Sequence, residues 1–161
     1  MIAEIMKKMI ADSHGSLHDI DHFIKVHSYA KTIVELEGVD ADTLFILEAA
    51  AIVHDIACPG LRERFGRCDG KAQEREGMPL ARELLAEFKL APAQLDRIVF
   101  LVGHHHTPDE VDGIDYRILL EADYIVNAGE SGCSRENIKN ARDRLFETDA
   151  GREILADIYG V

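Results

Sequence analysis

Basic residues are scarce in this sequence. Among its 161 residues, 18 Lys and Arg stand against 30 Asp and Glu, for a formal net charge of −12 at pH 7. Proteins that bind nucleic-acid polymers broadly rely on accumulated Lys and Arg to neutralise phosphates. The composition therefore argues against a nucleic-acid polymer as the partner.

Long apolar runs are also missing. No stretch comes near the roughly 18 to 20 apolar residues that cross a membrane, so we expect no membrane partner. The first ten residues, MIAEIMKKMI, carry Glu4 and lack a small-residue cleavage site, so no secretory signal is expected. Their Met and Ile side chains are expected to cover the core.

Cysteine is infrequent, and no CxxC pattern is present. The three cysteines are Cys58, Cys68 and Cys133, an odd number. This usage favours free thiols in a reducing compartment, and we therefore expect a cytoplasmic protein. Cys58 is interpreted as structural, because a thiol nucleophile needs a neighbouring base that a sequence cannot show.

What the sequence has is enough apolar material for a core, since 47% of its residues are hydrophobic. The length predicts one domain over residues 1–161. Apolar residues recur at helical spacing, and no segment alternates with a period of two. We expect a compact all-α bundle of about seven or eight helices, over residues 1–11, 17–38, 42–55, 72–88, 92–105, 115–128, 135–146 and 152–158, with a loop over 59–71 and a turn over 107–113.

Eight histidines are the unusual feature, and some lie on apolar helix faces. His22 shares a stripe with Val26 and Ile33, and His54 follows an Ala-rich core face with Asp55 beside it. Asp123 shares the face of a later helix with apolar residues. A buried aspartate is costly unless it is paired or binds a metal.

Together, His22, His54, Asp55 and Asp123 predict a divalent-metal site. Mixed nitrogen and oxygen ligands suit Mn, Fe, Co, Ni or Zn. Each residue alone has another interpretation, because a histidine on an apolar face is more often a hydrogen-bonded core residue, and Asp123 could pair with an arginine or cap a helix. The combination favours the metal.

Three segments resemble the HD-domain superfamily of metal-dependent phosphohydrolases. They are HDIDHFIKV (residues 18–26), LEAAAIVHDIA (47–57) and LLEADYIVN (119–127), so the motif-bearing core covers about residues 17–128. The resemblance implies that His22, His54, Asp55 and Asp123 are metal ligands. It does not extend to His27, which lies on another helix face.

Many members of this family hold a second metal with extra histidines. In this chain His104 and His105 are the further candidates, followed by His106, although a solvated histidine turn is the alternative. The family often has a histidine a few residues before a glycine, but here Gln73 and two glutamates precede Gly77. We therefore expect a single metal ion or, as the alternative, one ion together with a second that binds more weakly.

Hydrolysis of a phosphomonoester or phosphodiester of a small molecule, such as a nucleotide, is the activity that the resemblance implies. Asp55 would hold and orient the attacking water, and His105 would protonate the leaving oxygen. The alternatives are a catalytically silent metal- or nucleotide-binding regulatory module and a purely structural metal. The C-terminal segment allows a homodimer. Candidate phosphate-binding residues, against the alternative of a solvated loop, are Lys25, Arg62, Arg64, Arg67 and Lys71.

Overall fold

The computed structural model describes residues 1–161 and contains no strand. The all-α architecture expected from the sequence is confirmed. The elements are α1 (Ile2–Asp12), α2 (Leu17–Leu36), α3 (Ala41–Val53), α4 (Cys58–Phe65), α5 (Gly70–Leu85), α6 (Pro92–Val102), the 3-10 helix η1 (Pro108–Glu110), α7 (Ile114–Glu130), α8 (Arg135–Arg144) and α9 (Asp149–Tyr159).

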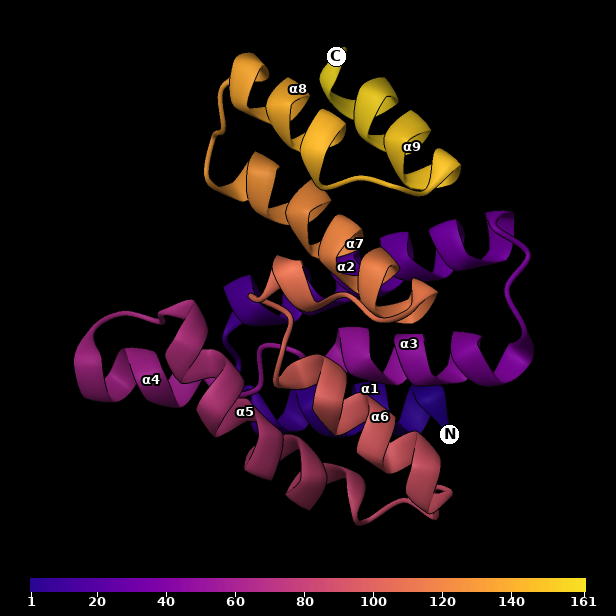
Figure 1. Ribbon diagram of the computed structural model, residues 1–161. Helices are drawn as coiled ribbons and strands as arrows, with labels where there is room; N and C mark the ends of the chain where they lie inside the picture. Colours follow the sequence, from indigo (N-terminus) through magenta and orange to yellow (C-terminus); the bar gives the residue numbers. More distant parts are fainter.

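Helices α2, α3 and α7 form the centre of the bundle. α2 packs against both α3 and α7, α3 also contacts α1 and α6, and α5 packs on α6. Figure 1 shows α8 and α9 stacked beyond α7, with α5 and α6 at the opposite end. Each central helix buries an apolar stripe, as with Val26 on α2, Leu47 on α3 and Ile118 on α7. The histidines and aspartates of interest lie on these same stripes.

The segment after His54-Asp55 is helical where a loop was expected. Pro59 and Gly60 were interpreted as helix breakers, but proline is well tolerated in a first turn because its missing N–H has no partner there. Pro59 therefore lies in the first turn of α4, and Gly66 ends that helix with φ +70°. Asp69 then caps α5 by accepting a hydrogen bond from the backbone N–H of Ala72 at 3.0 Å.

The helix that leads to His54 is more apolar than expected. The helical stretch Ala41–Phe65 is, by length and composition alone, long and apolar enough to cross a membrane, contrary to our expectation from the sequence. Of its most apolar window, however, 61% is buried inside the structure. The core helix of a soluble protein passes the same test, so the stretch is weak evidence of a membrane span.

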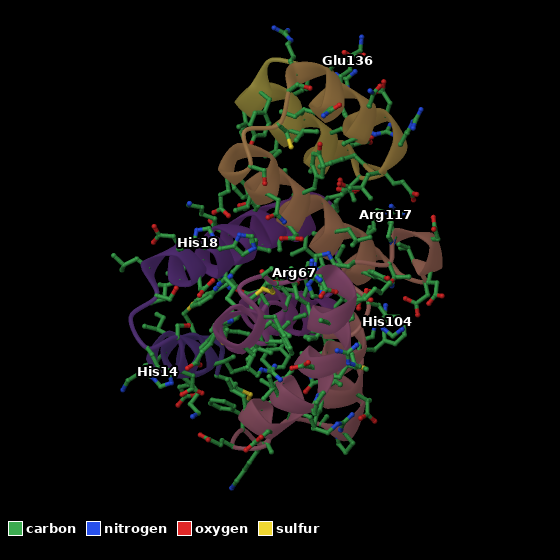
Figure 2. The ribbon with its side chains drawn as sticks, turned by 90° about the vertical axis from the view of Figure 1, so that its left-hand side faces the viewer. His14, His18, Arg67, His104, Arg117 and Glu136 are labelled. Carbon is green, nitrogen blue, oxygen red and sulfur yellow. A yellow bond between two sulfur atoms is a disulfide. The ribbon has the colours of Figure 1, made fainter.

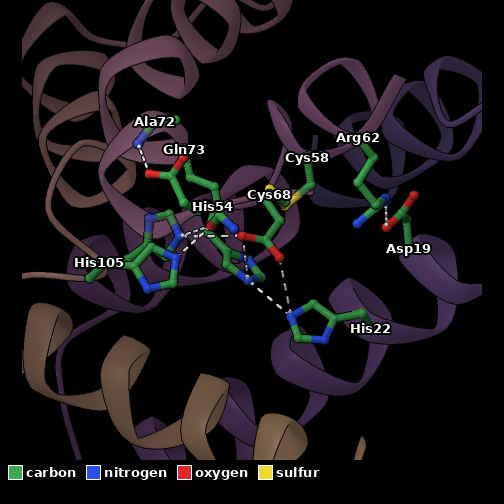
Figure 3. The surroundings of a disulfide bond; sticks show 12 residues. Asp19, His22, His54, Cys58, Arg62, Cys68, Ala72, Gln73 and His105 are labelled. Carbon is green, nitrogen blue, oxygen red and sulfur yellow. Dashed lines mark hydrogen bonds and ion pairs between the residues drawn. A yellow bond between two sulfur atoms is a disulfide. The ribbon is translucent and has the colours of Figure 1, made fainter. Parts of the chain in front are cut away.

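Cys58 and Cys68 form a disulfide, so the expectation of three free thiols is wrong, and only Cys133 is unpaired. A loop over residues 59–71, as the sequence predicts, would not bring the two cysteines together. Instead, α4 turns the chain back and brings the two Cα atoms within 5.4 Å of each other. The disulfide fixes α4 beside the His54-Asp55 turn, among the histidines of the core (Figure 3).

Removing this disulfide is expected to destabilise the protein. The bond closes a short loop, with a sequence separation of 10. The loss of chain entropy in the unfolded state then corresponds to roughly 2–3 kcal/mol. Chemical denaturation of the Cys58→Ala/Cys68→Ala variant should show a decrease of that size, whereas Cys133→Ala should show a smaller one. Equal unfolding free energies for the wild type and the double variant would contradict the pairing.

Candidate metal centre

His22, His54 and Asp123 meet in the core between α2, α7 and the end of α3. His22 Nε2 lies 3.2 Å from His54 Nε2 and 3.2 Å from Asp123 Oδ1, and His54 Nε2 lies 3.5 Å from the same oxygen. All three residues are buried. Ligand bonds of about 2.0–2.1 Å around one ion place neighbouring ligand atoms roughly 3.0–3.4 Å apart. The group therefore has the composition and spacing to hold a metal ion, and it contains three of the four ligands that the sequence predicted, without Asp55.

Asp55 lies between this group and a second one. Its Oδ2 is 3.5 Å from His22 Nε2, and its Oδ1 is 3.7 Å from His54 Nε2. The same Oδ1 lies 3.2 Å from His105 Nε2. Asp55, His105 and His106 together form a second cluster of ligand atoms close enough to hold an ion. One carboxylate thus faces both groups.

In His22, His54 and His105, the ring nitrogen that faces away from the centre has a hydrogen-bond partner. His54 Nδ1 donates to the Ala51 carbonyl at 2.9 Å, and His105 Nδ1 donates to the Val102 carbonyl at 2.7 Å. His22 Nδ1 instead donates to Glu130 Oε2 at 2.9 Å. Such partners fix the tautomer and orientation of a histidine, so that its Nε2 lone pair points at the metal position.

Glu130 is the one carboxylate that orients a ring of the first group from outside, and its removal is expected to weaken metal binding. Loss of such a partner commonly lowers metal affinity by about 10- to 100-fold. The Glu130→Gln variant should show that loss in a Mn²⁺ titration by calorimetry. Glu136→Gln is the matched control, because Glu136 lies exposed on α8, away from the site (Figure 2). Identical affinities for both variants would exclude the positioning role of Glu130.

Electrostatics in this cluster favour charged residues in the absence of an ion. Burial disfavours a charged His54 ring, but the Asp55 and Asp123 carboxylates outweigh burial and raise the pKa of His54 to about 9. Burial would likewise raise the pKa of Asp123, but hydrogen bonds from His22 and His54 hold that pKa well below its usual range. For His106, burial together with the neighbouring His105 lowers the pKa to about 4. His106 is therefore neutral near pH 7.

The raised pKa of His54 predicts how the stability of the metal-free protein depends on pH. The folded His54 keeps its proton up to about pH 9, whereas an unfolded histidine loses it near 6.5. Its stabilising contribution is therefore fully present below pH 6.5 and is lost as pH rises to 9, by on the order of 2 kcal/mol. Urea unfolding in the presence of a chelator at pH 6.5 and pH 9 measures the difference. A free energy of unfolding that is constant or higher at pH 9 would contradict it.

The turn that carries His105 and His106 is held from two sides. Glu74 Oε1 accepts hydrogen bonds from the backbone N–H of His106 at 2.9 Å and from Thr107 Oγ1 at 2.7 Å. On the other side, the buried Tyr116 hydroxyl lies 2.6 Å from the His104 carbonyl and 2.5 Å from the Thr107 carbonyl, and hydrogen-bonds to them. These contacts fix the direction in which the two rings point.

Gln73 occupies the place where the family resemblance implies a histidine. Its Oε1 lies 3.2 Å from His105 Nε2 and also hydrogen-bonds to His106 Nε2. α5 comes close enough to α6 for this contact because a Cβ atom on Gly77 would lie only 2.9 Å from a Val102 methyl. The second group therefore ends in an amide oxygen, a weaker ligand than an imidazole.

His104 is not part of either group, although it was the second-ranked extra ligand. Its Nδ1 donates to the Phe100 carbonyl at 2.7 Å, and its ring stacks on the Phe100 ring with centroids 4.0 Å apart. These contacts draw the ring back along α6, toward the outside of the fold (Figure 2). His106, ranked below it, is the residue that joins His105.

Carboxylates partner four of the five candidate phosphate-binding residues. Lys25 Nζ lies 3.4 Å from Glu130 Oε1, and Lys71 Nζ lies 2.8 Å from Glu74 Oε2. Two further ion pairs join Arg62 to Asp19 (Figure 3) and Arg64 to Glu76. Arg67 is exposed and has no ion pair. None of the five contributes to either group.

Several residues that shape the site were missed by the sequence interpretation. They are Glu130, Tyr116 and Asn127, whose amide donates to Asp123 Oδ1 at 2.8 Å. Asn127 could have been found, because it follows Asp123 by one helical turn and so shares its face. Glu130 could not, since it meets His22 across 108 positions of sequence.

Cavities near the site are small. One of about 250 Å³ is bounded by His105, His106 and Asp123. A larger hollow of about 460 Å³ near Glu37 and Arg117 includes no residue of either group. Comparison of the chain with protein-family models, with curated proteins and with solved structures finds no match, so the residues that could hold a metal stand on their geometry alone.

Proposed function

We propose that this protein is a metal-dependent phosphohydrolase of the HD-domain type. The observation that carries the proposal is the position of Asp55, whose carboxylate faces both the His22/His54/Asp123 group and His105. A metal with a purely structural role usually has a closed ligand shell and needs no such neighbour. The order of the motifs along the chain supports the same proposal.

The roles of the residues follow from their positions. When bound, a divalent ion would lower the pKa of a coordinated water and polarise a phosphoryl oxygen. His22, His54 and Asp123 would hold that ion, and Asp55 would orient the attacking water and accept its proton. His105 would donate a proton to the leaving oxygen from Nε2, since its Nδ1 is bound to the Val102 carbonyl.

The choice of metal and the substrate belong to the proposal as well. Two imidazoles and a carboxylate suit Mn, Fe, Co, Ni or Zn, because these ions accept mixed nitrogen and oxygen ligands. A phosphate ester of a small molecule would be the substrate, and we propose no nucleic-acid polymer and no membrane as a partner.

Turnover of phenyl phosphate tests this function. The protein is treated with a chelator, dialysed and then assayed with each of the five ions in turn. We expect hydrolysis that requires added metal and saturates with it. A protein that binds metal but hydrolyses no phosphate ester would instead support a silent metal-binding module.

A further inference from the structure

The cavity of about 250 Å³ beside the candidate centre is lined by both polar and apolar side chains. His105, His106 and Asp123 belong to this lining, so a group that enters the cavity lies beside residues of both clusters of ligand atoms. A substrate whose phosphoryl group is held at the centre would therefore place its remaining part in this cavity. The cavity along Lys25 and Glu130 is bounded by no residue of the two groups, and neither are the larger hollows elsewhere on the molecule.

Most of the other side chains that line the cavity are apolar. Leu120 and the Tyr124 ring come from α7, Leu145 from the end of α8, and Pro108 from η1. The Tyr124 hydroxyl points away, toward the Asn137 carbonyl at 3.4 Å, so the ring itself faces the cavity. Such walls favour an uncharged ring or short hydrocarbon group.

No lysine or arginine borders this cavity. Lys71 contacts Thr107, next to the histidine turn, but its ammonium is engaged by Glu74 at 2.8 Å and Thr107 Oγ1 at 2.6 Å. A second phosphate or a carboxylate on the substrate would thus lose its hydration without gaining a charged partner, which is costly.

Asn127 is a further polar side chain of the lining, beside the two histidines and Asp123. Its side-chain amide nitrogen donates a hydrogen bond to Asp123 Oδ1 at 2.8 Å, and its side-chain amide oxygen has no hydrogen bond within the chain. That oxygen can accept a hydrogen bond from a single hydroxyl or N–H group. The cavity is also smaller than the roughly 300–1,000 Å³ typical of sites for larger ligands.

Building on the proposed function, we infer that the substrate carries one phosphoryl group and a small, uncharged, largely apolar organic group that occupies this cavity. The absence of Lys and Arg from the lining disfavours nucleoside di- and triphosphates, and the small volume favours a small organic group. The wall residues Leu120, Tyr124 and Leu145 then determine specificity, while the two His/Asp groups determine the chemistry.

Binding of three phosphonates to the Mn²⁺-loaded protein tests this inference without requiring turnover. Phenylphosphonate should bind about tenfold more tightly than methylphosphonate, because only its ring can pack against the apolar side chains of the lining. 4-Carboxyphenylphosphonate should bind about tenfold more weakly than phenylphosphonate, because its carboxylate finds no cation. Isothermal titration calorimetry gives all three constants.

Two variants place a cation in the cavity wall. Leu145→Arg should tighten binding of 4-carboxyphenylphosphonate by about tenfold and weaken phenylphosphonate. Pro108→Arg, at an exposed position, should change both affinities in the same direction. It keeps the test valid if Leu145→Arg fails to fold. Leu36→Arg, exposed at the far end of α2, is the matched control and should leave all three constants unchanged.

The outcomes separate this inference from the proposed function. Tight phenylphosphonate binding without hydrolysis of phenyl phosphate would support the cavity and overturn the hydrolase. Hydrolysis of phenyl phosphate combined with equal affinity for all three phosphonates would overturn the inference and leave the hydrolase standing. Unchanged constants in both wall variants would also overturn it.

Discussion

Replacing Asp55 by Asn is expected to reduce the turnover of phosphate esters at least about a thousandfold. The carboxylate lies 3.5 Å from His22 Nε2 on one side and 3.2 Å from His105 Nε2 on the other. An amide has nearly the same shape, but it cannot accept a proton from water and is a weaker ligand. The variant should therefore fold and yet fail in the chemical step.

Steady-state kinetics with saturating metal measures this effect, with circular dichroism as the check on folding. Asp157→Asn is the matched control, because Asp157 is exposed on α9 and forms no ion pair. Activity of Asp55→Asn within tenfold of the wild type would remove Asp55 from the mechanism.

Replacing Gln73 by His is expected to complete a second metal site. Gln73 Oε1 already lies 3.2 Å from His105 Nε2 and hydrogen-bonds to His106. An imidazole at this position would be the third one in the group, after those of His105 and His106, beside the Asp55 carboxylate. A divalent transition metal prefers an imidazole to an amide oxygen as a ligand. The wild type should bind about one ion per chain tightly, and the variant about two.

Equilibrium dialysis against Mn²⁺ or Zn²⁺ followed by elemental analysis gives these stoichiometries. Gln94→His, which adds a histidine on α6 outside both groups, is the control for weak surface binding. A Gln73→His variant that still binds a single ion would show that the Asp55/His105/His106 group does not act as a metal site.

All the helices except α4, and three of the candidate ligands, could be predicted because they depend on local periodicity. His22, His54 and Asp123 each lie on an apolar stripe, and a stripe indicates which face of a helix is buried. The same reasoning placed Asp55 one position round from His54. The structure brings these stripes together in the core, with the Nε2 atoms of the two histidines 3.2 Å apart.

Contacts between distant segments could not be predicted in this way. The disulfide depends on how tightly α4 turns the chain, and the contact between Gln73 and His105 depends on the close packing of α5 on α6. Periodicity identifies the inner face of each helix but not the register in which two faces meet. The histidine turn shows the same limit, because its backbone hydrogen bonds select His106 over His104.

Elemental analysis of the purified protein beside its His54→Ala variant tests the central claim, that His22, His54 and Asp123 hold a divalent metal. His54 is fully buried and contributes one of the three ligand atoms. We predict about one Mn, Fe, Co, Ni or Zn per wild-type chain, tightly bound, and a loss of that metal in the folded variant. A wild-type protein that contains no metal, even after incubation with Mn²⁺ or Fe²⁺, would contradict the account.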